Sequence, residues 1–146
     1  YSNLPALAEI PIVKVRISNS GKEFDQEQEM GQRRPLVAGV RHSWLTSHDV
    51  NAQQLVALNI LDDSMQPSLH AGDLIVVDTG EIEPRDGDVF VVEYESQILI
   101  RRIVRDAGNW WLTSDNPDQR RYSRKIFNVE TGLIFGKAIL KETDKI

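Results

Sequence analysis

The chain has 146 residues, of which 40% are hydrophobic and 27% are charged, a composition typical of one globular domain with its own core. It has no cysteine, which excludes disulfides and thiolate metal sites, and its three histidines are scattered, so we expect no metal centre and no cofactor. The formal net charge of −5 argues against direct DNA binding, because a protein that neutralises phosphates is usually basic.

No apolar run approaches the roughly 18 residues that a membrane-spanning helix needs, and no signal peptide opens the chain. We therefore expect a cytoplasmic protein with no membrane partner. The chain begins at Tyr1 rather than at a methionine, which favours a fragment whose N-terminal part has been removed.

The first 50 residues mix one apolar stretch with polar sequence. Residues 10–17 alternate β-branched and other side chains and predict a strand. Residues 18–35 are polar, charged and punctuated by glycine, so they predict a long loop or arm. Residues 43–55 form the best helical segment, which Asn51 could divide in two.

From about residue 55 onward, short apolar runs alternate with turn signals at a spacing of roughly 8 to 12 residues, which favours strands. The expected strands cover residues 55–61, 74–78, 88–94, 98–105, 110–113 and 132–140. About seven short strands and one or two short helices predict a mainly β fold of twisted, coiled antiparallel sheets. We divide the chain into an N-terminal arm and linker, residues 1–50, and a β domain, residues 51–146.

The segment LDDSMQPSLHAGDLIVVD at residues 61–78 is the most informative part of the sequence. It places Ser64 in a turn, with Pro67 and a Gly-Asp pair before an apolar strand. Such a turn can present the serine hydroxyl to an extended peptide at the edge of a sheet. A serine in a turn is far more often structural than nucleophilic, so these residues alone do not establish catalysis.

This segment resembles the nucleophile motif of the C-terminal domains of LexA and phage CI-type repressors, which are Ser/Lys autopeptidases. The family's later segments also have counterparts here, in the same order: PRDGD before VFVV, then ILIRRIVRDAGNWWLTSDNP, then GLIFGKAIL. The resemblance covers about residues 55–140 and implies the LexA/signal-peptidase-like fold. The upstream stretch IPIVKVRISNSGKEF resembles the prophage repressors of this family, many of which lack an obvious cleavage site.

The resemblance implies that Ser64 is the nucleophile and that a lysine on a later strand is the general base. The matching position, 37 residues after Ser64, is Arg101. A buried lysine can become neutral and accept a proton, whereas an arginine keeps its charge because its pKa stays above about 12. We therefore expect that catalysis is lost and that the chain is not an active enzyme.

Three further features bear on cleavage. Asp62 stands where the family usually has glycine, so the motif reads DDSM rather than GDSM, and this change is expected to alter the nucleophile's approach. The segment SDNPDQRRYS carries extra basic residues, which are typical of a solvated loop rather than of a DNA contact. Active members cut their own linker at an Ala-Gly or Cys-Gly bond, and the candidate here is Ala38-Gly39, a dipeptide that also arises easily by chance.

The resemblance implies a C-terminal dimerisation and regulatory domain of a phage- or prophage-type transcriptional repressor. It would form a homodimer or a higher homo-oligomer and bind operator DNA through a helix-turn-helix domain upstream; an antirepressor protein and RecA are further candidate partners. Two alternatives stay open: a self-cleaving autopeptidase of the SOS-response type that uses another base, and a small β-rich ligand- or protein-binding module.

Overall fold

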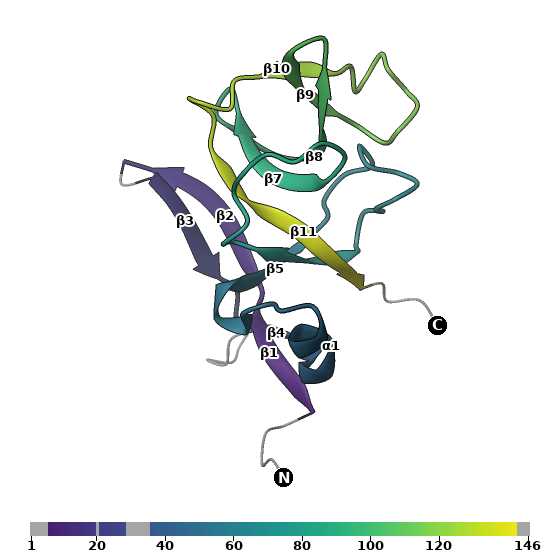
Figure 1. Ribbon diagram of the computed structural model, residues 1–146. Coiled ribbons are helices and arrows are strands. Elements are labelled where there is room, and N and C mark those ends of the chain that lie inside the picture. Colours follow the sequence, from purple (N-terminus) through teal and green to yellow (C-terminus); the bar gives the residue numbers. More distant parts are fainter. Residues whose placement is uncertain (1–5, 20, 29–35, 143–146) are drawn as a thin grey trace.

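The computed structural model describes residues 6–19, 21–28 and 36–142. Within these ranges the chain forms eleven strands, one α-helix and one 3-10 helix (Figure 1). Every pair of neighbouring strands is antiparallel, and a single parallel bridge joins Ile12 to Ala57. These observations confirm the predicted fold class, a mainly β domain of antiparallel sheets with short helices.

Seven strands form the main sheet, in the order β10-β9-β8-β7-β11-β6-β5. Their bounds are β5 Leu55–Asn59, β6 Leu74–Asp78, β7 Val89–Tyr94, β8 Gln97–Asp106, β9 Asn109–Thr113, β10 Lys125–Phe127 and β11 Ile134–Glu142. Six of them lie where the apolar runs predicted strands. The seventh, β10, was not predicted, because three residues in a charged segment carry too little of the alternating pattern.

The last strand, β11, crosses the middle of the molecule and joins the two halves of this sheet (Figure 1). Its first part pairs with β7 and its second part with β6, with a register irregularity on each side. At Gly136 an added Cβ would lie 2.6 Å from the carbonyl oxygen of Asp78, so only glycine permits this approach of the two backbones.

The four strands within the first 50 residues form two small sheets that pack against the large one. The strands are β1 Leu7–Pro11, β2 Val13–Ser18, β3 Gly21–Gln26 and β4 Val37–Arg41. β1 pairs with β4, and β2 pairs with β3. The single strand predicted over residues 10–17 is therefore divided at Ile12, where the chain passes from one small sheet to the other.

The prediction of a loop over residues 18–35 is wrong for β3, which pairs with β2. At one end of this hairpin Gly21 lies opposite Ser18, and at the other end Gln26 lies opposite Val13. Two of its acidic residues, Glu23 and Asp25, both contact Arg16 of β2. Residue 20 and residues 29–35 of the predicted loop lie outside the described ranges. The sequence did not predict this strand because Phe24 is the one large apolar residue of β3 that packs against the core, so β3 has no alternating apolar pattern.

The predicted helical segment is divided near Asn51, as its sequence allowed. Helix α1, His42–Ser47, ends before Asp49, which has a positive φ of 54°. The Asn51 side chain then accepts a hydrogen bond from the backbone N–H of Gln53 at 3.0 Å and caps the 3-10 helix Ala52–Gln54. No helix within the described residues is long and apolar enough to cross a membrane.

The described core has three clusters of buried side chains. One lies beneath the turn of Ser64 and joins β2, β5, β6, β7 and β11; its members are Val13, Leu58, Ile60, Met65, Leu69, Ile75, Val77, Val91 and Phe135. A second packs β1, β4 and α1 onto β5 and β6. The third lies between β7, β8, β9 and β10. The first cluster places the Ser64 turn against the β2–β3 hairpin.

Candidate functional site

The turn that carries Ser64 lies between β5 and β6 and is anchored from two sides. Met65 is 1% exposed and packs into the core cluster beneath it. On the other side, the backbone N–H of Asn116 donates to the Ser64 carbonyl oxygen at 3.1 Å, and the Asn116 side-chain amide donates to the Asp63 carbonyl oxygen at 2.8 Å. The SDNP segment after β9 therefore holds the serine turn in place.

Arg101 lies on β8 opposite Phe90 of β7, and its side chain reaches Ser64. Its Nη1 donates to Ser64 Oγ at 2.8 Å and to the Ile100 carbonyl oxygen at 2.9 Å. Both residues are buried, at 1% exposed for Ser64 and 7% for Arg101. Burial lowers the pKa of Arg101, although nearby Asp62 and Tyr122 oppose that shift. Even so, an arginine stays protonated in a protein, so Arg101 cannot accept the serine proton.

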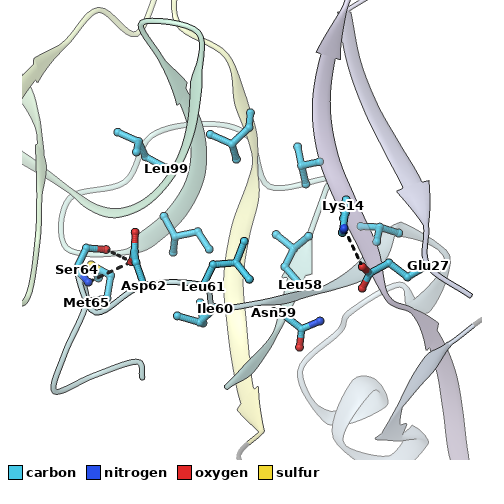
Figure 2. Close-up of a pocket in the computed structure, with 14 residues that line it drawn as sticks. Lys14, Glu27, Leu58, Asn59, Ile60, Leu61, Asp62, Ser64, Met65 and Leu99 are labelled. Atoms are coloured by element: carbon cyan, nitrogen blue, oxygen red, sulfur yellow. Dashed lines mark hydrogen bonds and ion pairs between the residues drawn. The ribbon is translucent and has the colours of Figure 1, made fainter. Parts of the chain in front are cut away.

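Asp62 completes the immediate surroundings of Ser64. Its Oδ1 accepts hydrogen bonds from Ser64 Oγ at 2.8 Å and from the Ser64 backbone N–H at 3.1 Å (Figure 2). Ser64 Oγ therefore accepts a hydrogen bond from the Arg101 guanidinium and donates one to the Asp62 carboxylate. The sequence marked Asp62 as a departure from the family's glycine, but it did not predict this contact.

A second carboxylate on the turn is held by the segment after β9. Tyr122 donates a hydrogen bond to Asp63 Oδ1, which lowers the pKa of Asp63 and raises the pKa of Tyr122. Arg121 lies 3.7 Å from Asp63 Oδ2, and its Cζ is 5.0 Å from the centre of the Tyr122 ring. At least one of the extra basic residues therefore helps to position the serine turn.

None of the lysine side chains in the described part of the chain contacts Ser64. Lys14 lines the same cleft but lies at its far end, where its Nζ is 3.7 Å from Glu27 and its side chain is 78% exposed (Figure 2). Lys22 and Lys141 donate to the carbonyl oxygens of Ile134 and Ser68. No described lysine is placed to replace Arg101 as a base.

The structure does not bring the candidate cleavage bond to the serine. Ala38 and Gly39 lie in β4, opposite Ile10 and Glu9 of β1. Ala38 is 4% exposed and belongs to the core cluster of β1, β4 and α1. Neither residue lines the cleft that holds Ser64. Cleavage at this bond would require β4 to leave its sheet.

A cleft of about 350 Å³ opens beside Ser64 and runs toward the β2–β3 hairpin (Figure 2). Its lining is mainly apolar and comes from β2, from the end of β5 and from β8: Val13, Val15, Leu58, Ile60, Leu61, Met65, Ile98, Leu99 and Ile100. Leu61, next to Asp62, is 88% exposed at the rim. Within the described residues, no group of His, Asp and Glu side chains could hold a metal ion.

Next to the site, Arg102 of β8 and Asp115 form a bidentate pair. Arg102 Nε and Nη2 lie 2.9 and 2.6 Å from the two Asp115 oxygens, and Ser68 Oγ donates to the same carboxylate at 2.5 Å. The hydrogen bond from Arg102 is the main cause of a lowered pKa of Asp115. The hydrogen bond from Ser68 adds to this effect, and burial opposes it. The pair ties the end of the serine turn to β8.

Asp115→Asn is expected to lower the free energy of unfolding by about 1–3 kcal/mol at neutral pH, because it leaves a half-buried guanidinium without its counter-charge. Since the folded state holds the pKa of Asp115 below its usual value near 4, this stabilisation is present above about pH 4 and is lost as the pH falls through the lowered pKa. The native chain should therefore lose more stability on acidification than the variant does.

Urea unfolding at neutral and acidic pH measures both effects. The matched control is Asp106→Asn, because Asp106 pairs with Arg124 at 3.2 Å on the surface, with side chains 61% and 50% exposed. An exposed pair contributes at most about 1 kcal/mol. If acidification lowers the free energy of unfolding equally in the native chain and in Asp115→Asn, the stabilising role given to the Arg102–Asp115 pair is contradicted.

A β domain that holds a serine in a turn beside an apolar cleft, against a basic residue on another strand of the same sheet, has the architecture of a serine-peptidase fold. The Peptidase S24-like family matches this chain over residues 16–139. The chain belongs to that family, and the resemblance to the C-terminal domains of LexA and CI-type repressors is confirmed. No curated protein sequence matches the chain.

Proposed function

We propose that this chain is the C-terminal dimerisation and regulatory domain of a phage- or prophage-type transcriptional repressor that does not cleave itself. The observation that carries the proposal is the hydrogen bond of 2.8 Å from Arg101 Nη1 to Ser64 Oγ. This contact supports the view that a permanently charged group stands where a Ser/Lys autopeptidase needs a neutral amine.

Two other contacts support the loss of cleavage. The Ser64 hydroxyl donates to Asp62 rather than pointing freely into the cleft. The candidate bond Ala38-Gly39 is part of a paired strand. A self-cleaving autopeptidase is the alternative, and its base would have to be Asp62, the other titratable side chain that contacts Ser64 Oγ within the described residues.

In this proposal, residues 1–50 correspond to the arm and linker, residues 51–146 to the peptidase-fold domain, and a helix-turn-helix domain upstream binds the operator. Two chains that associate through this domain hold their DNA-binding domains at a high effective concentration, which raises operator affinity without a basic surface here. Induction would then use another route than self-cleavage, such as an antirepressor protein.

We expect sedimentation to show a dimer at concentrations on the order of tens of micromolar. Among the described residues, the second part of β11, residues 138–142, pairs with β6 but not with β7. A strand edge of this kind can pair with a strand of a second copy of the chain. Ile139→Lys, in this part of β11, is expected to shift the population toward monomer. Because Ile139 also packs against the core cluster of β1, β4 and α1, a shift counts only if the variant unfolds as cooperatively as the native chain.

Ile126→Lys is the control, because Ile126 is 53% exposed on β10, an edge strand that β9, β8 and β7 separate from β11. It should leave sedimentation unchanged, and thermal unfolding of both variants checks that they are folded. A native chain that stays monomeric throughout this concentration range would count against the dimerisation role and favour a small binding module.

A further inference from the structure

The two donors of Ser64 converge on one carboxylate oxygen. Its hydroxyl and its backbone N–H both donate to Asp62 Oδ1, at 2.8 and 3.1 Å. Behind the hydroxyl, Arg101 Nη1 supplies a positive charge 2.8 Å from Ser64 Oγ. The site is therefore already organised to hold a carboxylate, and the chain itself supplies the one that is bound.

Arg101 has no ion-pair partner within 4.0 Å among the described residues, although it is 7% exposed. Burial lowers the pKa of Arg101 despite the opposing effects of Asp62 and Tyr122, as expected for a buried guanidinium with no carboxylate in direct contact. A buried cation of this kind stabilises any anion that binds next to it.

The carboxylate that now occupies the site can be displaced. Asp62 is an exposed residue on a turn, and it lines the cleft together with Ser64. Rotation of its side chain into water would leave the hydroxyl and the N–H of Ser64 free to bind another carboxylate, with little loss of hydration for Asp62 itself.

The cleft beside the site suits a peptide in particular. Its walls are mainly apolar, and one of them is formed by the end of β5 and the residues after it. β5 is the last strand of the large sheet, and among the described residues its outer side makes one bridge, between Ala57 and Ile12. An extended peptide can therefore pair with the edge beyond Ala57 while its side chains enter the apolar cleft.

We propose that this cleft binds the C-terminal carboxylate of an apolar peptide. The carboxylate replaces that of Asp62 on the Ser64 hydroxyl and N–H, Arg101 supplies the counter-charge, and the preceding residues lie extended along the end of β5. The site thus becomes a receptor for peptide C-termini. This inference rests on one part of the proposed function, the permanent charge on Arg101, and needs neither the dimer nor the DNA.

The test uses three probes in titration calorimetry with the whole chain: the peptide N-acetyl-Ala-Val-Leu-Ala with a free carboxylate, the same peptide as its C-terminal amide, and decanoate. The free acid is expected to bind about tenfold more tightly than the amide, since it alone makes charge-assisted hydrogen bonds. Decanoate is expected to bind more weakly than the acid peptide, because it cannot pair with a strand edge.

Variants give a second, independent readout. Asp62→Ala removes the competing carboxylate and is expected to tighten binding of the acid peptide about tenfold. Arg101→Met removes the counter-charge and should lower the affinity for the acid peptide to the affinity that the native chain has for the amide peptide. The control is Asp106→Ala, which removes an exposed carboxylate outside the cleft and should change nothing. Asp62→Ala changes an exposed side chain, so it tests the proposal even if Arg101→Met does not fold.

Equal affinity of acid and amide, no binding of either, or weaker binding to Asp62→Ala would each overturn the proposal. If decanoate binds as tightly as the acid peptide, the cleft is a fatty-acid site rather than a peptide site, and the proposal is overturned as well. Failure of the proposed repressor function would show separately, as native fragments or as a monomer in sedimentation.

Discussion

The native chain is expected to give no fragments when it is incubated at pH 7 or at pH 10, with or without activated RecA. Raising the pH activates a Ser/Lys autopeptidase because it deprotonates the lysine, but Arg101 keeps its proton at any of these values. Removal of a general base typically slows such a reaction by about 100- to 10,000-fold. Gel electrophoresis over several days measures the result.

Arg101→Lys places an amine next to Ser64 in the same buried position. Burial favours the neutral form of a lysine, so the variant gains a group that can accept the serine proton. Because Ala38-Gly39 lies in β4, fragmentation alone could miss this gain. A fluorophosphonate that labels activated serines avoids that difficulty, and we expect labelling of Arg101→Lys at pH 10 but not of the native chain.

Ser64→Ala is the control for both measurements. Native fragments or native labelling that disappear in Ser64→Ala would show that the site is active despite Arg101. Asp62→Ala then separates the explanations, since loss of that activity would identify Asp62 as the base. Labelling that appears in Arg101→Lys and disappears when Ser64 is also replaced supports the proposed loss of catalysis.

Phe135→Ala is expected to lower the free energy of unfolding by about 3–5 kcal/mol, the range typical of aromatic-to-alanine changes in a core. Phe135 on β11 is 1% exposed and belongs to the core cluster that includes Val13 and Met65. Its ring meets that of Phe24 edge to face, with centroids 5.9 Å apart. The change therefore leaves a cavity beneath both the serine turn and the β2–β3 hairpin.

Denaturant unfolding followed by tryptophan fluorescence measures this loss. The control is Ile126→Ala, because Ile126 is 53% exposed and its truncation should change stability by about 0.5 kcal/mol or less. Phe24→Ala and the double variant complete a double-mutant cycle. Because the two rings are in contact, the loss of unfolding free energy in the double variant should differ from the sum of the two single losses. A loss below about 1 kcal/mol for Phe135→Ala would contradict the packing described.

Much of this protein is readable from local sequence. The strands β6 and β7 begin as continuous apolar runs, and β8 carries apolar runs on either side of Arg101 and Arg102, all bounded by turn residues. Strands of this kind form in nearly any context that buries them. The order of the motifs from Ser64 to β11 indicated the family. The replacement of lysine by Arg101 also bears on catalysis directly, because the ability of a guanidinium to keep its proton is a property of the side chain.

Other features depend on partners that are distant in sequence. β3 is a strand because β2 pairs with it and because Phe24 packs against Phe135, more than a hundred residues later. β10 is a strand because β9 pairs with it. The same holds for Asp62: its residue type is visible in the sequence, but its hydrogen bonds to Ser64 depend on the conformation of the turn, which Asn116 and the core under Met65 hold in place. Pairing, packing and side-chain geometry arise only when the chain has folded, and they decide what surrounds the serine.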